Sequence, residues 1–200
     1  QSNNYTFRTI GSAYANYHIL PELTLRGEFG GDFTNLTSDR YSGSQSNFGQ
    51  SVGGYGEAYS ARVENYDMKL LLTYANHFSD AHQLEVTGGF EYQPYSQFYS
   101  KVDGQGFPND NLKTLASASQ IVYGTSYLTE YRFLSYFARA NYSYREKYLF
   151  SLTGRLDGSS RFGEDERYGF FPSASAGWIL TREDFMASIP VVSFLKVRAS

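Results

Sequence analysis

Residues 148–178 read YLFSLTGRLDGSSRFGEDERYGFFPSASAGW, and the first part of this stretch alternates in character from one residue to the next. Apolar or small side chains occupy the even positions from Tyr148 to Leu156. Polar side chains occupy the odd positions through Asp157, with Leu149 as the exception. A period of two is the pattern of an extended strand. The stretch therefore predicts a β-strand with one face that contacts lipid or a protein core and one that contacts water.

The same alternation recurs along the chain and predicts about eight strands. It is clearest where Leu23, Leu25 and Phe29 alternate with polar side chains that carry all the charge of that segment. A Thr and an Asp in the spacing of a capping box also predict a short helical turn at residues 181–188. The predicted strands are residues 7–18, 23–34, 59–77, 83–93, 131–144, 148–157, 170–180 and 192–200.

The connections between these strands are alternately short and long. The short ones are residues 19–22, 79–81 and 145–147, and the long ones are residues 35–58, 94–130 and 158–169. In an antiparallel sheet this places the short turns on one rim and the long loops on the other, as in outer-membrane barrels. The pattern predicts an all-β chain, an antiparallel transmembrane β-barrel segment of about eight strands with short periplasmic turns and long extracellular loops. The alternative is a secreted soluble β-sandwich that binds carbohydrate through exposed aromatic residues.

The composition excludes several classes of protein. Aromatic residues make up 18% of the chain, with 19 Tyr, 16 Phe and one Trp, and Tyr suits a membrane interface because its ring is apolar and its hydroxyl polar. The chain contains no run of about 18 apolar residues, so no transmembrane helix is predicted. The formal net charge of -3 is mixed along the chain, so no nucleic-acid partner is expected. The absence of cysteine excludes disulfides and thiolate metal sites.

Motifs in the last part of the chain carry a family resemblance. They are DGSSRFG at residues 157–163, RYGFFPS at residues 167–173 followed by Trp178, EDF at residues 183–185, and LKVRAS at residues 195–200. In order and spacing they resemble the barrel signature of the SusC/RagA family of TonB-dependent transporters.

The resemblance implies a segment from the middle of a barrel in the bacterial outer membrane, surrounded by outer-membrane lipid. Proteins of this family import oligosaccharides or peptides, with a SusD-like surface lipoprotein as a lid. Import is driven by the TonB complex, which contacts a box that precedes an N-terminal plug. Because residues 1–200 show neither the box nor the plug, we expect both, and the final strands, to lie outside them.

Two groups of residues are candidates for function. Aromatic side chains in the expected loop 94–130 are candidate contacts for the ligand or the lid, with packing within the loop as an equal alternative: Tyr95, Phe98, Tyr99, Phe107, Tyr123 and Tyr127. Charged side chains on the polar faces of the expected strands are candidates for lining the lumen or bonding to the plug: Arg26, Glu28, Asp32, Glu85, Glu91, Arg139 and Arg155.

The DGSSRFG motif is expected to be structural, because it lacks the Gly-Lys-Ser/Thr ending of a phosphate-binding loop and the spaced carboxylates of a calcium loop. We expect Asp157 to accept hydrogen bonds from loop amides, Gly158 to relax the turn and Arg161 to pair with a carboxylate. The other members of the motif are Ser159, Ser160, Phe162 and Gly163.

No cofactor and no enzymatic activity are expected. Asp and Asn residues at 103–106 and 109–111 offer oxygens of the kind that bind calcium, but exposed polar loops contain such groups by default. The three histidines are dispersed, and no Ser-His-Asp signature is present.

Overall fold

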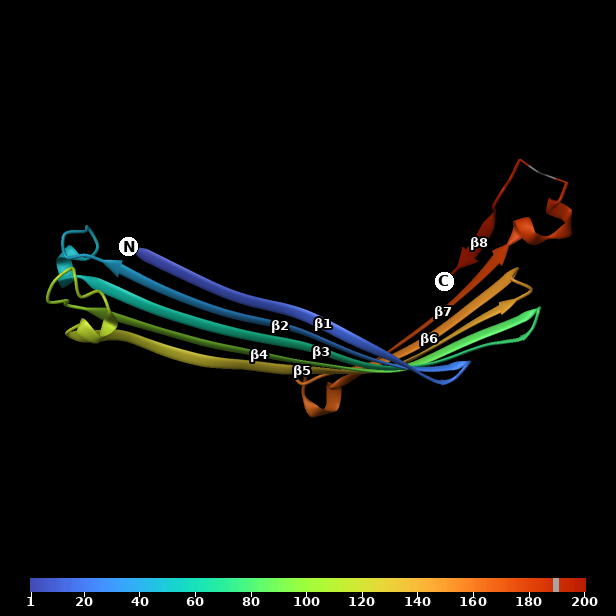
Figure 1. Ribbon diagram of the computed structural model, residues 1–200, viewed down its shortest axis with the longest axis horizontal. Coiled ribbons are helices and arrows are strands. Elements are labelled where there is room, and N and C mark those ends of the chain that lie inside the picture. The colour runs from blue at the N-terminus through green and yellow to red at the C-terminus, as the bar shows by residue number, and fades with distance from the viewer. Residues whose placement is uncertain (189–190) are drawn as a thin grey trace. The chain divides into compact units, whose positions relative to one another are not determined.

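The computed structural model describes residues 1–188 and 191–200, and its strands form one antiparallel sheet (Figure 1). Each strand pairs with its neighbours along the chain, in the order β1 to β8. The predicted all-β fold of eight antiparallel strands is confirmed. No helix among the described residues is long and apolar enough to cross a membrane. The strands are β1 Ser2–Leu20, β2 Leu23–Ser42, β3 Tyr55–Ser79, β4 His82–Gln105, β5 Gln120–Tyr144, β6 Tyr148–Ser159, β7 Tyr168–Ile179 and β8 Lys196–Ala199.

The chain divides into two compact units, and the longer strands contribute residues to both. The first unit consists of Gln1–Gly11, Gly30–Tyr66 and Pro94–Tyr131, and the second of Ser12–Phe29, Asp67–Gln93 and Arg132–Ser200. Loops 43–54 and 106–119 lie side by side at one end of the first unit (Figure 1). The second unit contains the three short turns.

Strands β1 to β7 begin or end beyond the predicted ones, so the long loops are shorter than expected, whereas β8, Lys196–Ala199, is shorter than the predicted strand at residues 192–200. The expected loops at residues 35–58, 94–130 and 158–169 are reduced to residues 43–54, 106–119 and 160–167. The added residues mix polar and aromatic side chains without a clean alternation. They can still form strands, because strand pairing satisfies the backbone whatever the side chains are. Alternation is needed only where one face is kept from water.

The segment after β7 also differs from its prediction. Two short 3-10 helices, Leu180–Arg182 and Asp184–Met186, replace the expected helical turn at residues 181–188. Neither helix has a side-chain cap, so the expected capping box is wrong. The Thr181 hydroxyl instead accepts a hydrogen bond from the Leu195 amide at 3.4 Å.

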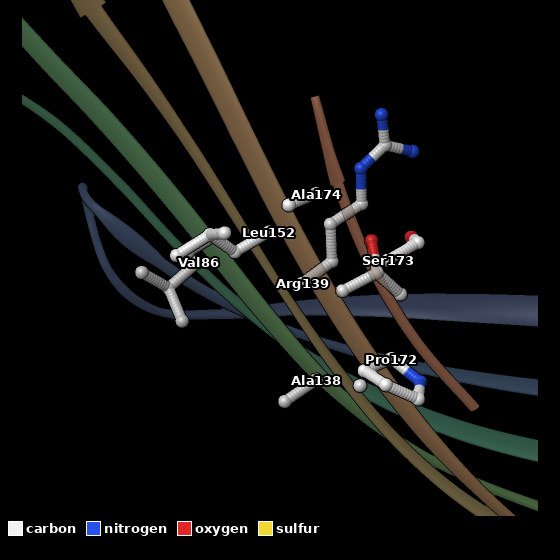
Figure 2. A pocket seen from close by; sticks show the side chains of 10 residues that line it. Val86, Ala138, Arg139, Leu152, Pro172, Ser173 and Ala174 are labelled. Carbon is white, nitrogen blue, oxygen red and sulfur yellow. The ribbon is translucent and has the colours of Figure 1, made fainter. Parts of the chain in front are cut away.

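The two faces of the sheet in the second unit differ in chemistry. We call the side that carries Met68, Leu70 and Leu72 of β3 the apolar face, and the opposite side the polar face. Leu152 of β6 lies on the apolar face and is 61% exposed. In Figure 2, the Arg139 side chain extends away from Leu152, toward the polar side of the sheet. Large apolar side chains are therefore left uncovered on one whole face.

Almost no hydrophobic core is present among the described residues. The buried hydrophobic residues are Tyr41, Ala61 and Phe107. A soluble sandwich buries the facing side chains of two sheets, whereas the described residues form one sheet. The β-sandwich alternative is therefore wrong.

Glu183 ties the link after β7 to the turn between β5 and β6. Its carboxylate accepts hydrogen bonds from Lys147 Nζ at 2.9 Å, Tyr148 Oη at 2.9 Å and Trp178 Nε1 at 3.0 Å. The Lys147 ammonium group, followed by the Trp178 and Tyr148 donors, lowers the pKa of Glu183 from 4.5 to about 2. This clamp explains why the link lies against the hairpin.

We expect the Glu183 clamp to be lost in acid. A depressed folded-state pKa means that the contribution is fully present above pH 4.5 and is lost as the pH falls through about 2. The indole N–H resonance of Trp178, assigned by Trp178→Phe, should therefore titrate in that window in the full-length protein. In Glu183→Gln the resonance should be independent of pH there. An indole resonance that titrates equally in both proteins would contradict the clamp.

Candidate functional site

The polar face carries a network of paired charges centred on Glu91 of β4. The Glu91 carboxylate lies 2.7 Å from Arg155 Nη2 of β6 and 3.2 Å from Lys69 Nζ of β3. Arg155 also binds Asp157 at 2.6 Å, and Lys69 binds Asp67 at 2.8 Å. Glu91 is buried, with 8% of its surface exposed. The network therefore neutralises a desolvated carboxylate with two cations.

The other predicted charged residues form smaller groups. Asn141 links Glu85 to Arg139, since Asn141 Nδ2 donates to Glu85 at 3.1 Å and Arg139 Nε donates to Asn141 Oδ1 at 3.1 Å. Arg26 and Glu28 form an ion pair at 2.5 Å. The structure thus brings together members of the predicted set within each group.

Several partners in these groups were not predicted. Asp32 pairs with Arg8 of β1 at 2.6 Å, and Lys69 and Asn141 were also missed. Lys69 was detectable, because it alternates with the apolar residues Met68 and Leu70. Arg8 was not, because β1 has no clean alternation.

A cluster of tyrosines lies in the first unit, where β4 and β5 run side by side. Tyr95 stacks on Tyr131 with ring centroids 4.5 Å apart, and Tyr99 stacks on Tyr127 at 4.6 Å. Tyr59 of β3 meets Tyr99 edge to face at 5.1 Å. We call these five residues the tyrosine cluster. Stacking uses one face of each paired ring, and the Tyr95 hydroxyl donates to Gln97 Oε1 at 3.0 Å, so the cluster offers the ring faces that remain.

Charged groups border the tyrosine cluster. The Lys101 ammonium lies 5.9 Å from the centroid of Tyr123 and forms an ion pair with Glu57 at 2.7 Å. Tyr123 and Tyr127 are each half exposed. The surface thus combines accessible aromatic rings with hydrogen-bonding groups, as ligand sites do.

The predicted loop position of the six candidate aromatic residues is wrong for all but Phe107. Tyr95, Phe98 and Tyr99 lie on β4, and Tyr123 and Tyr127 on β5, because these strands are longer than expected. Phe98 is adjacent to Tyr99 on the strand and therefore lies on its opposite face. Phe107 lies in the loop but is buried.

Buried Phe107 forms the small core beneath the two long loops. Its ring meets Tyr41 edge to face at 5.0 Å. A Cβ added at Gly56 would lie 2.8 Å from the Phe107 ring, so this glycine allows the ring to approach the strand. Phe107 thus supports the loops and is not available to a ligand.

Asp110 joins the two long loops of the first unit. Its carboxylate accepts hydrogen bonds from the Ser44 amide at 2.8 Å, the Ser44 hydroxyl at 3.3 Å and the Tyr41 hydroxyl at 2.9 Å. These donors, the Ser44 amide first, lower the pKa of Asp110. All the donors come from β2 or loop 43–54, so Asp110 latches loop 106–119 onto loop 43–54.

We expect Asp110→Ala to free the two loops from each other. The amide of Ser44 should exchange with deuterium about tenfold faster, because it loses a bond to a charged acceptor. Hydrogen exchange of the full-length protein, read by mass spectrometry, measures this. Asp39→Ala is a matched control on neighbouring β2, and equal exchange in both variants would contradict the latch.

The serines of the DGSSRFG motif accept hydrogen bonds from a backbone amide of β5 and from one within the motif. Ser160 Oγ accepts a hydrogen bond from the Arg132 amide at 2.9 Å, and Ser159 Oγ from the Arg161 amide at 3.3 Å. The expected role of Asp157 is wrong, because its carboxylate binds Arg155. Gly158 lies within β6, so its expected role in the turn is also wrong.

No group of three metal-ligating side chains of the His, Cys, Asp or Glu type occurs in residues 1–188 and 191–200. Asp110 uses its carboxylate in the loop latch. Asp103 is buried with Lys101 Nζ 3.6 Å away. The carboxylates of the suggested calcium loops thus have other neighbours.

Comparison with known proteins gives consistent matches, although no model of a protein family matches the chain. It is 31% identical over its whole length to TonB-dependent receptor P26 of Formosa agariphila, spanning 21% of that protein. It is 32% identical over 94% of its length to TonB-dependent receptor SusC of Bacteroides thetaiotaomicron, spanning 18% of that protein. The chain thus spans about a fifth of the length of these curated relatives.

The fold matches a solved structure over nearly the whole chain. The structure of the RagAB peptide transporter superposes with a TM-score of 0.92 at 22% identity, covering 99% of this chain and 22% of that one. An open-open state of the RagAB peptide importer gives a TM-score of 0.87. Together with the two-faced sheet and the sequence matches, this identifies the chain as a β-barrel segment of a TonB-dependent receptor of the SusC/RagA family.

Proposed function

We propose that the chain forms part of the barrel wall of an outer-membrane importer that takes up oligosaccharides or peptides. The single observation that carries the proposal is the sheet itself, which has an uncovered apolar face and a polar face of paired charges. In a barrel, the apolar face contacts lipid and the polar face lines the lumen. Relatives named TonB-dependent receptor and SusC, and a fold shared with a peptide transporter, support this assignment.

The proposal extends to partners and to parts of the protein outside residues 1–200. A SusD-like surface lipoprotein would cover the side of the long loops, and the TonB complex would supply the energy through a plug and a TonB box. The support is the name of the relatives and the two-component name of the RagAB structure. No catalytic step is assigned to this chain.

Uptake by cells tests the proposal. Cells of the source bacterium that lack the gene should fail to accumulate a fluorescent oligosaccharide or oligopeptide that wild-type cells take up. Restoring the gene should restore uptake, whereas a version without its TonB box should not. Equal uptake by cells with and without the gene, across a panel of both cargo classes, would overturn the importer assignment.

Within this function we propose that the tyrosine cluster contacts the cargo. Tyr99→Ala and Tyr127→Ala should each weaken cargo binding by about tenfold, because each removes an aromatic contact of the hot-spot type. Binding of the imported cargo to the purified full-length protein in detergent measures the effect.

Phe98→Ala provides the matched control for the tyrosine substitutions. Phe98 is adjacent to Tyr99 on β4 but lies on the opposite face, so its removal should leave the affinity unchanged. If Phe98→Ala weakens binding as much as Tyr99→Ala, the tyrosine cluster is not a cargo contact and acts on the stability of β4.

A further inference from the structure

The polar face of the second unit contains a concavity lined by basic residues that form no ion pair with a carboxylate of the described residues. Its volume is about 680 Å³, and strands β4 to β8 contribute to its lining. Arg139 of β5 and Lys196 and Arg198 of β8 lie in it, with Glu85 as its acidic residue. Three positive charges against one negative charge give this surface a formal charge of +2, in a chain whose net charge is -3.

These three bases differ from most others in the chain. Arg8, Arg26, Arg62, Lys69, Lys101, Lys147, Arg155 and Arg182 each form an ion pair with a carboxylate. Among the described residues, no carboxylate lies within ion-pair distance of Arg139, Lys196 or Arg198, and Glu85 is bonded to Asn141. A surface on which several cations lie without carboxylate partners attracts anions.

The local packing directs at least one of these cations into the concavity. Lys196 is paired with Ile179 across the strands, but its side chain lies over Gly177 of β7, where an added Cβ would be 3.0 Å from Lys196 Cε. Lys196 therefore extends across β7 toward β6 and away from the outer side of β8. A side chain at position 177 would force Lys196 to shift, because 3.0 Å is closer than ordinary van der Waals contact.

The spacing of the cations defines the ligand. Three strand intervals separate β5 from β8, which amounts to about 14 Å at a spacing of about 4.8 Å per strand. One carboxylate cannot reach all three bases, whereas an oligomer with several carboxylates can. The lining also provides the hydroxyl group of Ser175. The Ser151 hydroxyl donates to Asn141 Oδ1 at 2.8 Å, and Asn141 is bonded to Glu85 and Arg139, so these two side chains hold the lining together. Tyr142 and Phe150 belong to the apolar face, so the polar face presents no aromatic ring here for stacking on a sugar.

We propose that this concavity binds an acidic peptide as it passes along the barrel wall, through ion pairs with Arg139, Lys196 and Arg198. This inference rests on the proposed function, because it requires that cargo reaches the polar face. A peptide is favoured over an acidic saccharide because no aromatic ring on the polar face lines the concavity for stacking on a sugar.

Binding of a labelled peptide to the full-length protein in detergent tests the inference. The probe is fluorescein-labelled hexaglutamate, with hexaglutamine as the neutral comparison, read by fluorescence anisotropy. The triple variant R139Q/K196Q/R198Q should bind hexaglutamate at least tenfold more weakly than the wild type. Wild-type binding should also weaken steeply with salt, since it depends on ion pairs.

A second triple variant controls for total charge. R40Q/R132Q/R167Q also removes three positive charges, but from residues outside the concavity, and it should change the affinity less than twofold. Equal losses in both triple variants would overturn the site, as would tighter binding of oligogalacturonate than of hexaglutamate. So would a full-length structure in which carboxylates from elsewhere in the protein pair with Lys196 and Arg198.

The outcome separates this inference from the proposed function. If cells import peptides or oligosaccharides but the purified protein does not bind hexaglutamate, the importer assignment stands and the acidic-peptide site fails. If hexaglutamate binds with the expected charge dependence but cells import no cargo, the site stands as a binding surface and the importer assignment fails. Gly177→Val adds a structural check, since obstructing the path of Lys196 should weaken hexaglutamate binding with no change in charge.

Discussion

The double substitution Lys69→Met with Arg155→Met is expected to destabilise the full-length protein by about 3 kcal/mol. Glu91 is buried, and these two side chains supply its cationic partners at 3.2 Å and 2.7 Å. Either single substitution leaves one cation in place, so each should cost much less. Together they leave a buried carboxylate without a counter-charge, and the double effect should exceed the sum of the single effects.

Urea titration of the full-length protein in detergent, read by the gel mobility of folded and unfolded forms, measures these differences. Adding Glu91→Leu to the double variant should restore most of the lost stability, because the buried charge is removed together with its partners. Asp67 and Asp157 keep access to solvent and tolerate the loss of their cations. Additive single effects, or no rescue by Glu91→Leu, would show that the network does not depend on the burial of Glu91.

The fold was predictable from the sequence where one face of a strand is apolar. Residues 148–157 were identified as a strand because alternation is enforced there, and β6 spans Tyr148–Ser159. Residues 94–105 were missed because they mix aromatic and polar side chains without a clean alternation, yet β4 continues through them to Gln105. The sequence of such a strand resembles that of a loop, because pairing with neighbouring strands satisfies its backbone without requiring an apolar face.

The candidate site was predictable by face but not by partner. Alternation placed Glu91 and Arg155 on polar faces of their own strands. Their contact joins β4 to β6, which are separated by β5, and it depends on the register between strands, which the alternation within one strand does not define. The same limit explains why Tyr95 and Tyr99 were assigned to a loop, although both stack on partners of β5.

Gly158→Val is expected to destabilise the protein by about 2 kcal/mol, because the site has no room for a side chain. Gly158 pairs with Tyr168 across β6 and β7, and a Cβ at this position would lie 2.5 Å from Tyr168 Cε1. The Tyr168 ring thus packs over the glycine, as aromatic rings do over glycines in neighbouring strands. This contact connects the DGSSRFG and RYGFFPS motifs and gives a physical reason for the glycine in the first of them.

Gly163→Val is the matched control within the same motif. Nothing lies within 4 Å of an added Cβ there, and the backbone φ of -57° suits any residue, so the change should stay within about 0.5 kcal/mol. Urea titration of the full-length protein again measures both variants. In a Tyr168→Ala background Gly158→Val should cost much less, because the ring that the new side chain would meet is gone. A cost at Gly158 that persists in that background would mean that the glycine is needed for its backbone and not for the space under Tyr168.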